Sequence, residues 1–127
     1  MSKDDRTILV VEDETPLQEA IRVKLRKSGF EVVTARTAEQ ALSYLQDLDR
    51  IDVVWLDHYL LGSENGLDLV VKIKGNKKWK KIPVFVVSNT ASADKVATYL
   101  NLGVERYYTK SDYRLDQIIQ DIKNSPV

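Results

Sequence analysis

Short apolar runs alternate with segments of helical periodicity five times along the chain. The runs occupy residues 7–11, 30–35, 52–57, 83–88 and 105–110. The first, third and fourth are almost continuous in Val, Ile, Leu, Trp and Phe, which is typical of parallel strands covered on both faces. We therefore predict a five-stranded parallel sheet with these three strands at its centre.

Helix-starting residues precede the segments in which apolar side chains recur at helical spacing. Thr15, Pro16 and Gln18 indicate an N-cap, a proline in the first turn and a capping-box glutamine, and Thr37 with Gln40 repeats the signal. Further helices are expected to begin near residues 65, 92 and 115. The buried stripe of the second helix is predicted to contain Leu42, Leu45 and Leu48, and the third helix is expected to run through Leu67, Val70 and Val71. The fifth helix is predicted to present one apolar face, made of Leu115, Ile118, Ile119 and Ile122.

The alternation of strand and helix predicts an α/β fold, a doubly wound sheet with five helices on its two faces. Each parallel connection needs a right-handed crossover, which places the helices on those faces. A chain of 127 residues suits one domain, and we expect residues 1–127 to form a single domain with its core over about residues 5–123.

Composition removes several classes of function. Basic and acidic residues each number 19, so no excess of positive charge indicates a nucleic-acid binder. The absence of cysteine excludes disulfides, thiolate zinc sites and thiol catalysis. The first residues, MSKDDRT, lack the apolar region of a signal peptide, and no apolar run approaches the length that spans a bilayer. We expect a cytoplasmic protein without a direct nucleic-acid or membrane partner.

Polar residues stand at the ends of four of the apolar runs. Glu12 and Asp13 follow the first, Asp57 ends the third, Ser88 ends the fourth and Lys110 ends the fifth. In a parallel sheet all of these residues emerge at one edge, where open α/β sheets bind ligands. Like charges about 4 Å apart repel by about 4 kcal/mol at an effective dielectric of about 20, so three carboxylates there require a cation or a raised pKa. A hard divalent ion bound by oxygen ligands, Mg²⁺, meets that requirement.

Such an edge suits phosphoryl chemistry. Asp57 is the candidate nucleophile, which would form an acyl phosphate, and Mg²⁺ would neutralise charge on the phosphoryl oxygens. Lys110 and Ser88 are candidate donors to the remaining phosphoryl oxygens. The apolar third run would hold the Asp57 carboxylate at the rim of the sheet with little freedom.

The ordered set VEDE, WLD, VVS and YYTK resembles the receiver domain of two-component response regulators, over about residues 5–123. The resemblance implies a flavodoxin-like sheet of strand order 2-1-3-4-5, as in the chemotaxis receiver. It also implies that Asp57 accepts a phosphoryl group from the phosphohistidine of a sensor histidine kinase or phosphotransfer protein. Glu12 and Asp13 would then hold Mg²⁺ together with Asp57 and the backbone carbonyl of Tyr59.

The resemblance assigns further roles around the phosphoacceptor. Ser88 matches the switch hydroxyl of the family, and Lys110 matches its invariant lysine. Tyr107 matches the aromatic residue that turns inward once Ser88 is drawn to the phosphate. Tyr59 and Thr90 occupy positions that tune the attack of water on the acyl phosphate.

A partner-binding face is implied on the fourth helix, fifth strand and fifth helix, around Val96, Tyr107 and Ile118. The downstream partner is unknown, and a phosphorylation-dependent homodimer is a further expectation. On this interpretation the chain is a signalling module whose catalysis is limited to its own phosphorylation and dephosphorylation.

Three positions depart from the family pattern. Ser111 follows Lys110 where a proline with a cis peptide bond is usual, which leaves the isomer of this bond open. Leu61 stands where proline is usual, in a loop one residue longer. Asn89 replaces a small residue after Ser88, and its bulk predicts slow labelling by small acyl phosphates.

Two other functions stay open. One is a phosphorylation-independent interaction module with the same fold, and the other is a small-substrate phosphatase with an aspartate nucleophile. Tyr59 argues against the second, because dehalogenase-like enzymes need an acid two residues after the nucleophile. His58 invites a metal or catalytic role, but the sequence offers no second histidine for a ligand set. The basic run of residues 74–81 contains Trp79 and is expected to be a solvated loop at the opposite edge of the sheet, with Trp79 covering the edge of the core.

Overall fold

The computed structural model describes residues 4–89 and 92–125. Its strands form one parallel sheet of order β2-β1-β3-β4-β5, as the sequence and the family resemblance predicted. The strands are β1 (Thr7–Val11), β2 (Glu31–Ala35), β3 (Val53–Leu56), β4 (Val84–Ser88) and β5 (Arg106–Thr109). The helices are α1 (Thr15–Lys27), α2 (Ala38–Asp47), α3 (Gly66–Lys74), α4 (Ala93–Asn101) and α5 (Leu115–Asn124).

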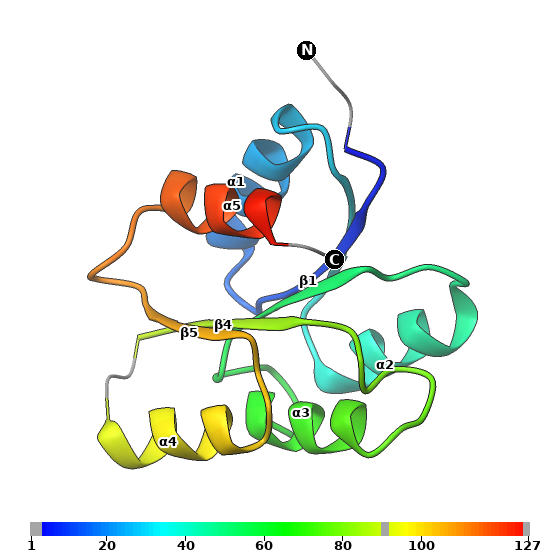
Figure 1. Cartoon of the computed structure of the whole chain (residues 1–127), viewed down its shortest axis with the longest axis vertical. Coiled ribbons are helices and arrows are strands. Elements are labelled where there is room, and N and C mark those ends of the chain that lie inside the picture. The colour runs from blue at the N-terminus through cyan, green and yellow to red at the C-terminus, as the bar shows by residue number, and fades with distance from the viewer. Residues whose placement is uncertain (1–3, 90–91, 126–127) are drawn as a thin grey trace.

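The helices cover both faces of the sheet (Figure 1). Helices α1 and α5 lie on one face, and α2, α3 and α4 lie on the other. Successive residues of β1 enter different cores: Leu9 and Val11 pack on the side of α2–α4, whereas Ile8 and Val10 pack on the side of α1 and α5. The predicted double coverage of the central strands is therefore confirmed.

The start of α1 differs from the prediction. Glu14 is the N-cap and its side chain makes no capping hydrogen bond, while Thr15 is already helical. The amide of Gln18 donates instead to the backbone carbonyls of Glu12 and Ala35, at 2.9 and 3.1 Å. Gln18 therefore joins the ends of β1 and β2, and the predicted capping box of this helix is wrong.

The later helix starts follow local sequence more closely. The Thr37 hydroxyl accepts a hydrogen bond from the backbone N–H of Gln40 at 3.0 Å, which confirms this N-cap. Asn65 and Asp68 form a reciprocal capping box at α3. Ser92 caps α4 by accepting from the backbone N–H of Lys95.

One residue predicted to lie on a buried helix face is exposed, and one apolar residue of α3 is exposed as well. Leu48 is 38% exposed because α2 ends at Asp47 and Leu48 is its extended C-cap. Val71 is 52% exposed because Leu69, Val70 and Ile73 form the buried face of α3. The helix does run through Leu67, Val70 and Val71, as expected.

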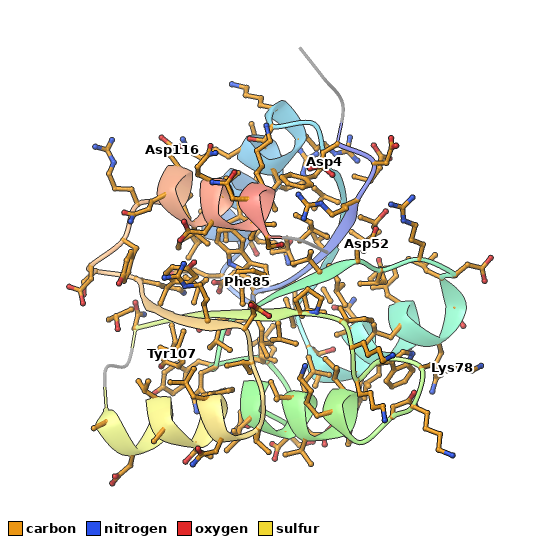
Figure 2. All side chains as sticks on the ribbon, in the orientation of Figure 1. Asp4, Asp52, Lys78, Phe85, Tyr107 and Asp116 are labelled. Carbon is orange, nitrogen blue, oxygen red and sulfur yellow. The ribbon has the colours of Figure 1, made fainter. Side chains whose placement is uncertain are left out.

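The basic loop between α3 and β4 lies at the edge of the sheet away from the strand ends that carry Asp57 and Ser88. Trp79 is half-buried and packs against the core on the side of α2–α4, as expected. Lys78, which Figure 2 labels, projects outward from this loop. Over the described residues, no helix combines the length and the apolar character that crossing a membrane requires.

Candidate functional site

The ends of the central strands bring the candidate residues to one edge of the sheet. The strand register pairs Val11 with Leu56 and Leu56 with Val86, so β1 and β3 end at the same level and β4 continues two residues further, to Ser88. The ladder continues into the site, because the Asp57 N–H donates to the carbonyl of Val11 at 3.0 Å and the Lys110 N–H to that of Ser88 at 2.8 Å. The backbones that carry the site are therefore fixed by the sheet itself.

Three carboxylates meet at this edge. Glu12, Asp13 and Asp57 each place one oxygen within 4.8 Å of the others. Glu12 is 1% exposed and Asp57 4% exposed, whereas Asp13 is half-buried. The predicted convergence of acidic groups far apart in sequence is therefore present.

Lys110 supplies positive charge to this cluster. Its Nζ lies 3.0 Å from Glu12 Oε1 and 3.2 Å from Asp57 Oδ2. Burial by itself lowers the pKa of this ammonium, but the hydrogen bond to Glu12 and the charge of Asp57 outweigh burial, so the pKa of Lys110 is raised. The ammonium therefore stays charged between two buried carboxylates.

One lysine does not balance three acids. Burial and the neighbouring charge of Asp57 raise the pKa of Glu12 from 4.5 to about 7. Asp57 Oδ1 is buried and has no hydrogen-bond partner among the described residues, although buried polar atoms are nearly always paired. An orphaned carboxylate oxygen next to two more acids fits a hard divalent cation such as Mg²⁺, which prefers oxygen ligands.

Ser88 and Tyr107 lie beside the carboxylates. Ser88 is fully buried at the end of β4, and Tyr107 is half-buried on β5. Burial raises the pKa of the Tyr107 phenol, and hydrogen bonding with Ser88 offsets part of that effect. The Tyr107 ring also contacts the ring of Tyr99 with centroids 5.6 Å apart. These contacts join β4, β5 and α4 next to the site, on the face of the sheet where Figure 2 shows Tyr107.

Two candidate residues and one peptide bond remain: Tyr59, Thr90 and the bond between Lys110 and Ser111. The side chain of Tyr59 is 53% exposed, and Lys95 of α4 lies 5.3 Å from the centre of its ring. Thr90 lies outside the described residues. The Lys110–Ser111 peptide bond is trans, since residues 4–89 and 92–125 contain no cis peptide.

The expected partner-binding face needs a correction at one residue. Ile118 is 1% exposed and packs in the core beneath α1 and α5, so it cannot contact a partner. The apolar stripe of α5 faces the sheet, which buries this position. Val96 and Tyr107 are both half-buried and lie on the other side of the sheet from Ile118.

Sequence reasoning missed the partner of His58. The His58 ring is 6% exposed, and its Nδ1 lies 2.6 Å from the hydroxyl of Tyr99 on α4. Alternation along β3 was the available signal: Leu56 faces α2–α4, and the residue two positions later faces the same way. No pattern in the sequence could identify Tyr99, which is 41 residues away.

The fold and site together define a class of protein. A doubly wound sheet of order 2-1-3-4-5 with an acidic cluster and a lysine at the carboxyl ends of its strands is the arrangement of a receiver-type signalling domain. The profile of the family described as "Response regulator receiver domain" matches residues 8–123. The chain belongs to this family, which acts in two-component phosphorelay signalling.

Individual relatives agree with this assignment. The chain is 31% identical over 105 residues to the phosphate regulon transcriptional regulatory protein PhoB of Pseudomonas aeruginosa, a match that covers 83% of the chain and 45% of PhoB. The chain thus corresponds to about half the length of that relative. Two solved structures are similar in fold: the Mn²⁺-bound response regulator Rcp1 (27% identity, TM-score 0.80, 93% and 91% of the two chains) and the phosphorylated cyanobacterial phytochrome response regulator RcpA (30%, 0.81, 94% and 90%).

Proposed function

We propose that this receiver domain accepts a phosphoryl group on Asp57 from the phosphohistidine of a sensor histidine kinase or phosphotransfer protein, in a Mg²⁺-dependent reaction. The observation that carries the proposal is the orphaned, buried Asp57 Oδ1 among the carboxylates of Glu12 and Asp13. Oδ2 already faces Lys110, so Oδ1 is the oxygen free to meet a metal ion or phosphorus.

The transfer forms one bond and breaks one. A carboxylate oxygen of Asp57 attacks phosphorus, the phosphorus–nitrogen bond of the phosphohistidine breaks, and the imidazole leaves with the electron pair and takes up a proton. Lys110 neutralises charge on the acyl phosphate, and Ser88 donates its hydroxyl to a phosphoryl oxygen. Mg²⁺ held by Glu12, Asp13, Asp57 and the carbonyl of Tyr59 would supply the further positive charge that the phosphoryl oxygens require.

The response requires several contacts to act together. Converting a domain from mostly one state to mostly another takes about 5.5 kcal/mol, whereas one hydrogen bond to a charged group contributes about 1.5 to 3 kcal/mol. We propose that Ser88 and Lys110 move toward the phosphoryl group together, and that Tyr107 follows Ser88. The partner-binding face would then change around α4 and β5, with Val96 and Tyr107 but without Ile118.

Two solved structures and two features of this chain support this proposal over the alternatives. RcpA is described as phosphorylated and Rcp1 as Mn²⁺-bound, and both share the fold of this chain. Tyr59 stands where a phosphatase with an aspartate nucleophile would need an acid. An interaction module that is never phosphorylated would not need an unpaired carboxylate oxygen in a buried acidic cluster. Autophosphorylation, autodephosphorylation and a cytoplasmic location belong to the same proposal.

Beryllofluoride, a mimic of the phosphoryl group, tests the function. Trp55 is buried two residues before Asp57, and a Trp79→Phe background removes the only other tryptophan. We expect beryllofluoride with Mg²⁺ to change Trp55 fluorescence saturably, with no such change in Asp57→Asn. Asp116→Asn, an exposed acid on α5, is the matched control and should respond normally. A response that persists in Asp57→Asn would refute Asp57 as the acceptor.

Ser88→Ala tests the proposed switch separately. In this variant beryllofluoride should still bind at Asp57, but the backbone amide shifts of residues 93–101 and 106–109 should change much less than in the wild type. Equal changes in the two proteins would show that Ser88 does not transmit the response.

A further inference from the structure

His58 and Tyr99 form a buried polar pair that the proposed phosphoryl chemistry does not use. The two side chains are 6% and 0% exposed, their polar atoms lie 2.6 Å apart, and their rings meet edge to face with centroids 5.7 Å apart. His58 directly follows Asp57 in the segment after β3, and Tyr99 belongs to α4. One short contact therefore joins the segment that carries the phosphoacceptor to the proposed output helix.

Tyr99 is the main anchor of α4. Among the residues of Ala93–Asn101 it alone is fully buried, while Lys95 and Val96 are half-buried. Its ring packs in the core against Tyr107, and its hydroxyl reaches His58. A displacement at the hydroxyl of Tyr99 would therefore act on the residue that anchors this short helix.

The same hydroxyl lies against the loop that begins at Asp57. The N–H of Gly66, the first residue of α3, donates to the carbonyl of His58 at 2.8 Å. A Cβ on Gly66 would lie 2.5 Å from the carbonyl oxygen of Asp57 and 2.9 Å from the hydroxyl of Tyr99. The two ends of this loop and the tyrosine hydroxyl thus pack closely around Gly66, so a shift of the loop there would press on Tyr99.

The pair is a neutral hydrogen bond. Burial, with a contribution from Lys95, lowers the pKa of His58, and burial raises the pKa of Tyr99. The imidazole is therefore uncharged and the phenol protonated at neutral pH, and the donor is set by the imidazole tautomer. The contact acts through geometry rather than through a change of charge.

We propose that the His58–Tyr99 contact couples the metal site to α4, so that Mg²⁺ binding at the carboxylates changes the conformation of α4 before any phosphoryl group is attached. The inference rests on the proposed metal site. The route runs from Asp57 through His58 to Tyr99 and differs from the route through Ser88 and Tyr107, which requires a phosphoryl oxygen to draw Ser88. His58 and Tyr99 are positioning residues in this scheme.

Mg²⁺ alone is the probe that separates the two routes, because it offers Ser88 no phosphoryl oxygen. In the wild type we expect Mg²⁺ to shift the backbone amide signals of residues 57–60 and also of residues 93–101. In Tyr99→Phe the loop signals should still shift, whereas the Mg²⁺-induced shifts on α4 should vanish. Mg²⁺ affinity should weaken by about three- to tenfold, the change expected from one lost buried hydrogen bond.

Tyr108→Phe is the matched control. Tyr108 is 2% exposed and its hydroxyl donates one hydrogen bond, to Asp121 Oδ2 at 2.7 Å, on the other face of the sheet. This variant should lose stability but keep the α4 response to Mg²⁺ and the affinity of the wild type. A double variant, His58→Phe with Tyr99→Phe, leaves neither polar group unpaired and should lose the α4 response while remaining folded.

The outcomes are distinct. Persistence of the α4 shifts in Tyr99→Phe, or a wild type in which Mg²⁺ shifts the loop but not α4, would overturn the coupling and leave the metal site standing. Absence of any Mg²⁺-induced shift at residues 57–60 in the wild type would refute the metal site and the coupling with it. Equal loss of the α4 response in Tyr108→Phe would reduce the effect to general destabilisation and refute the specific route.

Discussion

Lys110→Met removes the cation that the buried carboxylates share. Over residues 4–89 and 92–125, Lys110 is the only lysine or arginine paired with Glu12 or Asp57. At an effective dielectric of about 20, contacts of 3.0 and 3.2 Å correspond to gross attractions of about 5 kcal/mol each. Most of this attraction offsets desolvation, and removing one partner of a buried pair costs about 3 to 5 kcal/mol net.

The cost should depend on pH. Glu12, with its pKa raised to about 7, is mostly protonated at about pH 6. Lys110 is then paired with the carboxylate of Asp57 instead of with two carboxylates. We expect Lys110→Met to lower the free energy of unfolding by about 3 kcal/mol at about pH 8.5 and by roughly half as much at about pH 6. A domain with a stability of about 5 to 15 kcal/mol remains folded after this loss.

Urea unfolding with and without Mg²⁺ measures the effect. Saturating Mg²⁺ should restore part of the lost stability at the higher pH, because the divalent ion replaces the missing charge. Lys24→Met is the matched control: Lys24 pairs with Asp116 on the surface at 2.9 Å, so its loss should be within about 1 kcal/mol at both pH values. A loss in Lys110→Met that is the same at both pH values and with or without Mg²⁺ would refute the charge argument and assign the effect to packing.

Three further predictions concern the same site. Gly66→Ala should weaken Mg²⁺ affinity in a fluorescence titration, because the added Cβ would lie 2.5 Å from the Asp57 carbonyl oxygen. Gly75→Ala is the control and should leave Mg²⁺ affinity unchanged, because the nearest atom to its added Cβ lies at 3.2 Å. Equal losses of affinity in the two variants would contradict this reason. Asn89→Ala should speed labelling by acetyl phosphate in a mass-spectrometric time course, and an unchanged rate would exclude a steric role. The folded-state pKa of Glu12 lies above its usual 4.5, so the metal-free protein should lose up to about 3 kcal/mol of stability as the pH rises from 4.5 to about 7. Glu12→Gln should abolish this part of the pH dependence. A pH dependence that is unchanged in Glu12→Gln would contradict the assignment.

Much of the fold could be predicted because the sheet is parallel and buried on both faces. Continuous apolar runs identify the central strands, and a parallel arrangement forces their carboxyl ends to one edge. The convergence of Glu12, Asp57 and Lys110 follows from that one property. Helix capping was harder to predict, since the Gln18 amide donates to the backbone carbonyls of Glu12 and Ala35 and does not cap its own helix.

The rest depends on tertiary contacts that leave no periodic trace. The contact of His58 with Tyr99 joins residues 41 apart, and neither residue type indicates the other. Ile118 was placed on a partner face by the family resemblance, although the same helical spacing that makes it apolar turns it toward the sheet. The isomer of the Lys110–Ser111 bond, trans in the structure, likewise depends on the surrounding loop.

The most direct test of the account is the position of the phosphoryl group itself. The protein is incubated with Mg²⁺ and phosphoramidate, a small donor with a phosphorus–nitrogen bond, and acyl phosphates are then reduced with borohydride, which converts a phosphorylated aspartate to homoserine. Peptide sequencing by mass spectrometry should find homoserine at residue 57, and none when Mg²⁺ is removed by a chelator. Homoserine at another acidic residue, or unmodified Asp57 under conditions in which Mg²⁺ binds, would contradict the central claim.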